Sequence, residues 1–230
     1  MMSSKGWLSN SIFLLILIVV AASLPALAQK GKQDQNANRD PAADYYNRGN
    51  DRQKAGDLNG AIEDYTFAIT YNSKFAMAWN NRGNARLDKG DLAGAVADFD
   101  HAISLNSRYA QAYQGRANAR HAQKDLDGAI ADYSRAIDIN DRSALSWHNR
   151  GVARKDKGQL REAVADFDKA LKLEPNRAAT WAYRGLALLM QGKDADAERD
   201  FARCVELDPD LKESLKSRID EAKRQRSAIR

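Results

Sequence analysis

The sequence of 230 residues has few of the residue types that build catalytic or metal-binding sites. Its single cysteine, Cys204, excludes an intramolecular disulfide. Its three histidines, His101, His121 and His148, show no His-x3-His spacing, and no Cys-x2-Cys pair or glycine-rich phosphate loop occurs. These absences give no support to an enzyme, a metal site or a bound cofactor. We therefore expect a function carried by a surface.

An excess of charge of one sign is also missing from most of the chain. The formal net charge is +5, but residues 212–230 hold seven basic and three acidic residues, and Lys5 adds one basic residue. The other residues balance, so the excess charge belongs to the tail. A basic tail more often keeps a terminus solvated than it binds a polyanion, and we do not expect nucleic-acid binding. Binding of an anionic polymer by this tail stays open as an alternative.

Long apolar runs are absent except near the N-terminus, where residues 12–22 read IFLLILIVVAA. Lys5 precedes this run, and Pro25 and an A-x-A pattern ending at Ala28 follow it, which is the layout of a secretory signal peptide. We expect cleavage of residues 1–28 and export, to the periplasm of a Gram-negative bacterium. The alternative is an uncleaved inner-membrane anchor, although the run is short against the roughly 20 residues that span a membrane. The polar residues 29–41 should form a disordered spacer.

A 34-residue period organises the rest of the chain. Five units follow one another without insertion, at 42–75, 76–109, 110–143, 144–177 and 178–211. In each unit positions 4 and 24 are aromatic, position 8 is small and position 20 is alanine. The apolar spacing predicts two helices per unit, and a fixed period of this length is typical of a stacked array in which each unit packs on its neighbours.

Two positions mark the ends of the expected helices. Position 15, where the first helix should end, is Gly56, Gly90, Lys124, Gly158 and Gly192. Glycine accepts the left-handed conformation that closes a helix, so we expect Lys124 to turn by another route. Position 32 should start the next helix, as a cap or an early helical proline; it is Ser73, Ser107, Asp141, Pro175 and Pro209.

The order aromatic, Gly, Ala, aromatic, Ala, Pro is clearest in the fourth unit, at Trp147, Gly151, Ala163, Phe167, Ala170 and Pro175. This pattern resembles the tetratricopeptide repeat. The resemblance implies an all-α fold, a right-handed superhelix of five two-helix repeats whose first helices line a concave face. Leu215, Ile219 and Ala222 continue the pattern once more. We expect residues 212–230 to form a capping helix over the exposed face of the last unit and a basic tail, with 225–230 frayed.

The sequence departs from the family pattern at position 7, which is arginine in all five units, while position 23 is always aspartate. Two antiparallel helices that turn near position 15 bring these two positions level. We expect a bidentate ion pair in each unit. The alternative is a row of arginines that contacts an anionic ligand.

The resemblance also implies which residues face the groove. Positions 2, 5, 6, 9, 12 and 13 of the first helices line it in this family. The groove should begin as a ladder of amides, which can bind a peptide backbone, and end apolar. We expect partner contacts from Asn47, Asn50, Asn80, Asn81, Asn84, Gln114, Asn118, His148, Asn149, Val152, Tyr183 and Leu186.

Two alternatives apply to this groove. The asparagines can be ordinary solvated residues, and the apolar end can be buried under a folded-back tail. A clamp for a C-terminal carboxylate, which some members of the family have, lacks its basic residues here, because the third unit has Gln111 and Gly115.

The sequence thus predicts an exported, non-enzymatic scaffold that binds a protein or peptide partner. The alternative is a membrane-anchored assembly subunit of an envelope complex.

Overall fold

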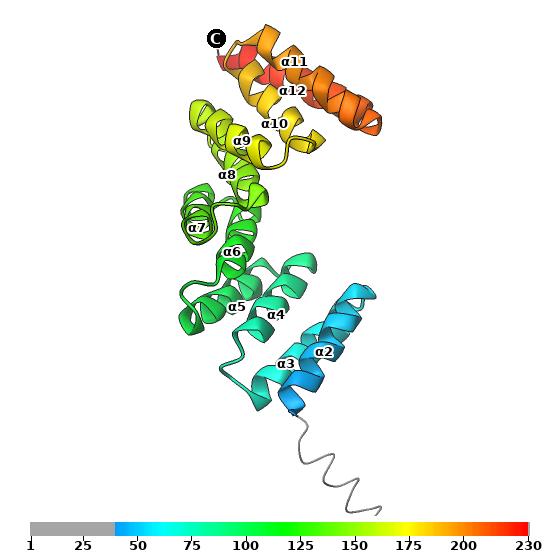
Figure 1. The fold of residues 1–230 in the computed structure, drawn as a ribbon, viewed down its shortest axis with the longest axis vertical. Coiled ribbons are helices and arrows are strands. Elements are labelled where there is room, and N and C mark those ends of the chain that lie inside the picture. The colour runs from blue at the N-terminus through cyan, green and yellow to red at the C-terminus, as the bar shows by residue number, and fades with distance from the viewer. Residues whose placement is uncertain (1–39, 230) are drawn as a thin grey trace, which may run out of the picture.

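The structure is a computed structural model, and it describes residues 40–229. The expected leader (residues 1–28) and nearly all of the spacer (29–41) lie outside this range. Across it the chain is helical, and the helices follow one another as antiparallel pairs along a curved rod (Figure 1). The first helices of the five units are α2 (Pro41–Lys54), α4 (Ala76–Asp88), α6 (Ala110–Ala122), α8 (Ala144–Asp156) and α10 (Ala178–Met190). The second helices are α3 (Leu58–Tyr71), α5 (Leu92–Leu105), α7 (Leu126–Ile139), α9 (Leu160–Leu173) and α11 (Asp194–Leu207). A 3-10 turn, Pro209–Leu211, leads into α12 (Lys212–Ile229).

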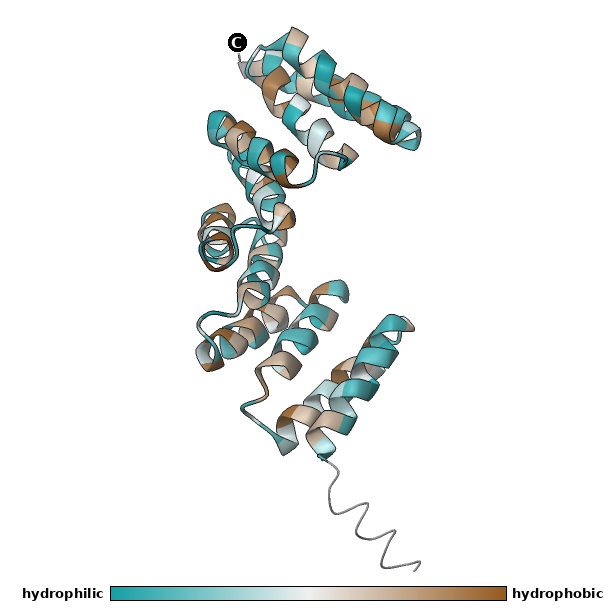
Figure 2. Cartoon of the chain, in the orientation of Figure 1, coloured by the Kyte–Doolittle hydropathy of each residue, from teal (hydrophilic) through white to brown (hydrophobic). Residues whose placement is uncertain are grey.

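The helices form two layers. Successive first helices, from α2 through to α10, contact one another, and α4, α6, α8 and α10 each also pack on the second helix of the preceding unit. The first helices therefore form the inner wall of the rod and the second helices its outer wall. Each helix carries both hydrophilic and hydrophobic residues (Figure 2), as expected for elements that bury one side. None of the helices within residues 40–229 is long and apolar enough to cross a membrane.

The core between paired helices depends on small residues. The alanines at position 20 are completely buried, and the aromatic rings at position 24 pack against the glycines at position 8. A Cβ atom added to Gly83 would come within 2.9 Å of the Phe99 ring, and one added to Gly151 within 2.7 Å of the Phe167 ring. The small side chains thus let the two helices approach closely.

The ends of the helices differ from the sequence-based expectation in two ways. Lys124 adopts the same left-handed backbone conformation as the glycines at its position, with φ of 66°, so the expectation of another route was wrong. Such a conformation costs a non-glycine residue roughly 1–2 kcal/mol. The packing of α6 on α7, which the turn permits, outweighs this cost.

Position 32 does not start the next helix, except at Pro209, which begins the 3-10 turn. The helices α4, α6, α8 and α10 begin three residues later, and position 32 lies in the preceding turn. Its carbonyl group accepts a hydrogen bond from the tryptophan at position 4 of the following unit. Trp79 bonds in this way to Ser73 at 2.9 Å, and Trp181 to Pro175 at 2.8 Å.

Helix α12 does not occupy the place of a sixth first helix. It packs mainly on α10, a first helix, whereas α4, α6, α8 and α10 each pack on the second helix of the preceding unit. Leu215 and Ala222 of α12 are buried against the α10 cluster that contains Leu186 and Leu189.

The expected fraying from residue 225 was wrong, because α12 continues to Ile229. Arg226 anchors this last part, since its Nη1 donates to the Leu189 carbonyl at 2.9 Å and its guanidinium pairs with Asp194.

Candidate partner-binding face

An arginine–aspartate pair joins the two helices of every unit. The arginine at position 7 donates through Nε and Nη2 to both carboxylate oxygens of the aspartate at position 23. In the second unit the bonds from Arg82 to Asp98 are 3.0 and 2.8 Å, and in the fourth those from Arg150 to Asp166 are also 3.0 and 2.8 Å. All five pairs form. The expected bidentate pair is confirmed.

Each of these arginines has further partners. Its guanidinium lies 4.6–5.4 Å from the centre of the aromatic ring at position 4, a cation–π distance. In units two to five, Nη1 reaches the previous second helix, as from Arg82 to Thr66 at 3.0 Å and from Arg184 to Asp168 at 2.6 Å. The arginines of units two to five therefore fix the angle between units and are occupied by these partners, whereas the side chain of Arg48 is 54% exposed and makes no such inter-unit bond.

The expected ladder of amides contains two kinds of residue, those that are hydrogen-bonded within the array and those that are not. Where position 24 is tyrosine, its hydroxyl group donates to the asparagine at position 9. The hydrogen bond from Tyr65 to Asn50 Oδ1 is 2.9 Å, and that from Tyr133 to Asn118 Oδ1 is 2.6 Å. Burial raises the pKa of Tyr65 to about 12, so this hydroxyl keeps its proton at neutral pH.

The next unit bonds to the same oxygen atoms. Asn81 Nδ2 donates to Asn50 Oδ1 at 2.9 Å, and Asn149 Nδ2 donates to Asn118 Oδ1 at 3.4 Å. These four asparagines connect neighbouring units, and the side-chain oxygens of Asn50 and Asn118 are used in these connections.

The second unit has phenylalanine at position 24, and the pattern is broken there. Phe99 has no hydroxyl group, and Asn84 makes no hydrogen bond within residues 40–229. The neighbouring unit has Gly115 at position 6, because a Cβ atom there would lie 2.5 Å from the Phe99 ring. Gln114, half-buried beside it, also has no hydrogen-bond partner in this range. Asn84 and Gln114 are therefore the amides whose donors and acceptors are open to a ligand, together with the exposed Asn47 at the start of the face.

Three other expected groove residues are buried. Leu186 is 6% exposed and packs under α12, as the folded-back-tail alternative anticipated. His148 is 6% exposed, and its Nδ1 lies 3.0 Å from Thr180 Oγ1. Burial, together with the positive charge of Arg177, lowers the pKa of His148 to about 4. Asn80 is 4% exposed, and its Oδ1 is buried without a hydrogen-bond partner.

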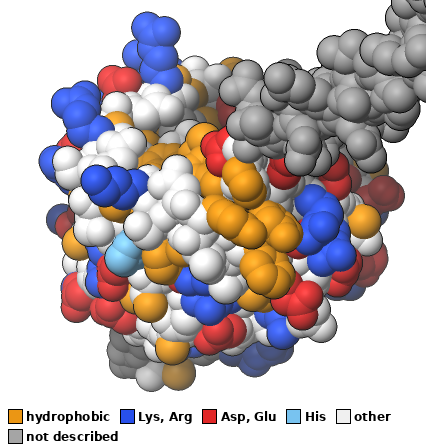
Figure 3. Space-filling model, turned by 90° about the horizontal axis from the view of Figure 1, so that it is seen from below, with side chains coloured by type: hydrophobic (Ala, Val, Ile, Leu, Met, Phe, Trp, Pro, Cys, Tyr) orange, Lys and Arg blue, Asp and Glu red, His pale blue; other side chains and the backbone are white. Residues whose placement is uncertain are grey.

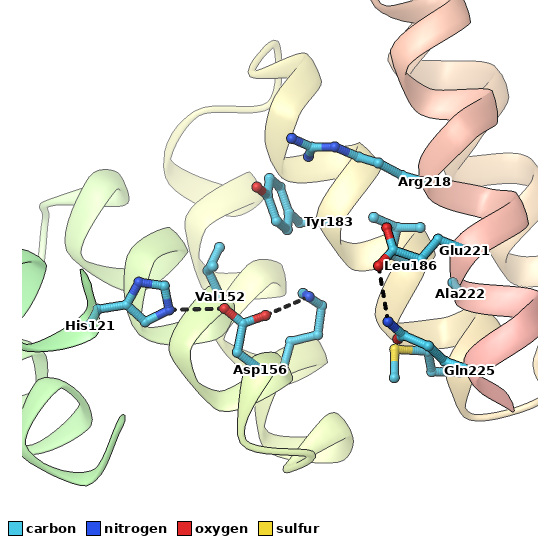
Figure 4. A pocket seen from close by; sticks show the side chains of 11 residues that line it. His121, Val152, Asp156, Tyr183, Leu186, Arg218, Glu221, Ala222 and Gln225 are labelled. Carbon is cyan, nitrogen blue, oxygen red and sulfur yellow. Dashed lines mark hydrogen bonds and ion pairs between the residues drawn. The ribbon is translucent and has the colours of Figure 1, made fainter. Parts of the chain in front are cut away.

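Two adjoining pockets indent the inner wall towards its C-terminal end. The first, of about 170 Å³, is lined by Asn118, His121, Tyr133, Asn149 and Val152. The second, of about 260 Å³, lies between α8, α10 and α12, and we call it the terminal pocket (Figure 4). Its lining comprises His121, Val152, Lys155, Asp156, Tyr183, Leu186, Met190, Arg218, Glu221, Ala222 and Gln225. Because His121 and Val152 line both, the two pockets form one continuous depression.

A charge network crosses this depression. Asp156 accepts from His121 Nε2 at 2.9 Å and from Lys155 Nζ at 2.7 Å (Figure 4). Burial acts to raise the pKa of Asp156, but these two hydrogen bonds outweigh it and lower the pKa to about 2. Sequence reasoning missed this network, although His121, Lys155 and Asp156 occupy positions 12 and 13 that face the groove in the family. Arg218 could not have been found in that way, because α12 lies outside the repeat register.

A larger hollow of about 420 Å³ lies between α9, α10 and α11, on the side of the second helices. Its charges all have partners: Arg184 bonds to Asp168 and Asp200, Arg199 pairs with Asp196, and Arg203 pairs with Glu206 outside the hollow. This hollow therefore holds no charge without an ion-pair partner. Within residues 40–229 no three histidine, cysteine, aspartate or glutamate side chains come together as metal ligands.

Comparisons with known proteins agree on the fold. Models of the tetratricopeptide repeat match residues 46–105, 117–158, 144–177 and 178–211. A search of curated proteins gave no match.

Several solved structures share the fold. MamA (residues 41 to the end) from Desulfovibrio magneticus RS-1 is 19% identical with a TM-score of 0.69, over 75% of this chain and 97% of that one. YrrB, described as a protein of this repeat type with an unusual peptide-binding site, is 19% identical with a TM-score of 0.66, over 84% and 97% of the two chains. The first such domain of Spaghetti (RPAP3), bound to the HSP90 peptide SRMEEVD, is 26% identical with a TM-score of 0.50, over 51% and 93%.

Proposed function

Because the chain belongs to the tetratricopeptide repeat family, we propose that it is a non-enzymatic scaffold that binds a segment of a partner protein along its inner wall. Proteins with this fold generally serve as interaction scaffolds, and two of the similar structures are described as binding peptides.

The observation that carries the proposal is the pair of open amides, Asn84 and Gln114. They lie on neighbouring first helices, where the bonds that occupy Asn50 and Asn118 are missing. An amide presents a donor and an acceptor, and so does each residue of a peptide backbone. A segment that passes these two residues can continue along the wall into the two pockets.

Photo-crosslinking tests this placement. A photoreactive amino acid is introduced at Gln114 on α6, and separately at the exposed Ala131 on α7 in the outer wall. We expect one partner to be captured in the native host from Gln114 and not from Ala131. Equal capture from both positions would contradict binding along the inner wall.

Side-chain variants give an independent measurement. Asn84→Ala combined with Gln114→Ala should reduce partner capture at least tenfold without a change in thermal stability. Asn118→Ala should lower stability instead, because it removes the acceptor of Tyr133. Undiminished capture by the double variant would argue against a role for the open amides.

We also propose that the protein acts after export, in the periplasm, on the strength of the leader pattern in residues 1–28. An uncleaved leader that tethers a scaffold subunit to the inner membrane is the alternative. Mass spectrometry of the native N-terminus distinguishes them, since a chain that begins at Gln29 supports export and a retained Met1 or Met2 supports the tether.

A further inference from the structure

Arg218 is the one charged group of the terminal pocket that lacks a partner of opposite charge or a hydrogen bond within residues 40–229. Asp156 is bonded to His121 and Lys155, and Glu221 Oε1 accepts from Gln225 Nε2 at 3.2 Å. The Arg218 guanidinium instead lies 5.2 Å from the centre of the Tyr183 ring (Figure 4). Its five N–H donors are open to a ligand.

The ring holds this arginine at the pocket. A cation–π contact orients a guanidinium at little cost to its hydrogen-bonding edge. Lys155 Nζ also lies near the same ring, at 5.8 Å from its centre, but it is paired with Asp156. The formal charges of the pocket therefore balance, since Glu221 offsets Arg218, but Arg218 is the cation whose donors are not used in an ion pair or hydrogen bond.

Part of the pocket's lining is apolar. Val152, Tyr183, Leu186 and Met190 come from α8 and α10, and Ala222 comes from α12. An apolar side chain placed among them would be removed from water, at a gain of roughly 25 cal/mol per Å² of buried apolar surface. A ligand with an apolar part next to an anionic part can therefore contact both the apolar surface of the pocket and Arg218.

We infer that the terminal pocket binds a carboxylate that lies next to an apolar side chain of the partner segment. This inference rests on the proposed function and names the chemistry of one anchor. The carboxylate pairs with Arg218 through two parallel hydrogen bonds, and the apolar side chain fills the space between Tyr183 and Met190. The carboxylate can be that of an aspartate or glutamate, or that of the partner's C-terminus. Helix α12 is then a wall of the binding site as well as the end of the array.

Three synthetic peptides test the inference by fluorescence anisotropy with the full chain. One carries an internal Phe-Glu and an amidated end, the second ends in phenylalanine with a free carboxylate, and the third carries Phe-Gln with an amidated end. We expect at least one carboxylate peptide to bind tenfold more tightly than the Phe-Gln peptide. Which of the two binds identifies the source of the carboxylate.

The variant Arg218→Gln should abolish that preference. The matched control is Arg224→Gln, which removes the same charge from an exposed position on the same helix and should keep the preference. Equal binding of all three peptides, a preference that survives Arg218→Gln, or an equal loss in both variants would overturn the inference. If one of these results were found while a partner still crosslinked from Gln114, the proposed function would stand and only this anchor would be rejected.

Discussion

Residues at the same position of the repeat have different roles, and the presence of a single hydroxyl group can determine the role. Asn50, Asn84 and Asn118 all occupy position 9. Tyr65 and Tyr133 bond to the first and third, but Phe99 leaves the second open. The same side chain is therefore a connector in two units and a candidate ligand contact in the unit between them.

His148 and Asn80 show the same principle at position 5. His148 bonds to Thr180, which occupies position 3 of the next unit. Position 3 of the unit that follows Asn80 is Ala112, which has no side-chain donor. This explains why Asn80 Oδ1 is buried without a partner.

The burial of His148 makes stability depend on pH. Its pKa in the folded state is about 4, below the ordinary value of 6.5. Between these values the unfolded chain binds a proton that the folded chain does not, so stability falls as the pH is lowered from 6.5 to 4. The loss from this residue should reach at most roughly 3 kcal/mol.

Urea unfolding at several pH values measures the effect. His148→Gln should flatten the dependence of the free energy of unfolding on pH between 6.5 and 4. His101→Gln, a change at an exposed residue of α5, should leave that dependence unchanged. An unaltered slope in His148→Gln would show that other groups cause the pH dependence.

At the scale of helices, the buried aspartate at position 23 organises each pair. Asp98 accepts two bonds from Arg82, and a third, of 2.8 Å, from Arg86 at position 11. The fifth unit has Leu188 at position 11, so Asp200 is bonded to Arg184 alone.

This difference predicts that removing Asp98 and removing Asp200 lower the free energy of unfolding by different amounts. Asp98→Ala leaves two guanidinium groups without their shared carboxylate and should destabilise by roughly 3–5 kcal/mol. Asp200→Ala should cost clearly less, because Arg184 keeps its bond to Asp168. Urea midpoints followed by circular dichroism compare the two variants, and equal costs would mean that the second arginine has no energetic role.

At the scale of the molecule, the two ends of the rod are finished differently. Units two to five bury small residues at positions 3 and 10 beneath the preceding helix, whereas the first unit has the exposed Asp44 and Asp51 there. These charges stop a further helix from stacking on α2. The same end also shows a hydrophobic patch (Figure 3), and the exposed Phe67 and Tyr71 of the first unit stack around Tyr45.

The other end depends on α12. In an array whose units contact only their neighbours, the last element can detach without unfolding the others. Leu215→Ala removes a buried anchor and should cost about 2–5 kcal/mol, enough to release α12.

Limited trypsin digestion detects the release, because α12 contains several exposed basic residues such as Lys216. We expect Leu215→Ala to be cut within α12 at least tenfold faster than wild type. Ser217→Ala, at an exposed position of the same helix, serves as the control. Cleavage spread equally over all five units would indicate that the rod unfolds as a whole.

The sequence by itself determined the period, the two helices of each unit and the arginine–aspartate pairs. It could do so because every unit meets the same neighbours, and the contacts within a pair follow from positions that recur every 34 residues. The tertiary structure alone decided which amides stay open, that Lys124 takes a glycine conformation, and that α12 turns onto α10 to complete a pocket. These features depend on which side chains lie across a junction in three dimensions, and those neighbours differ from one junction to the next.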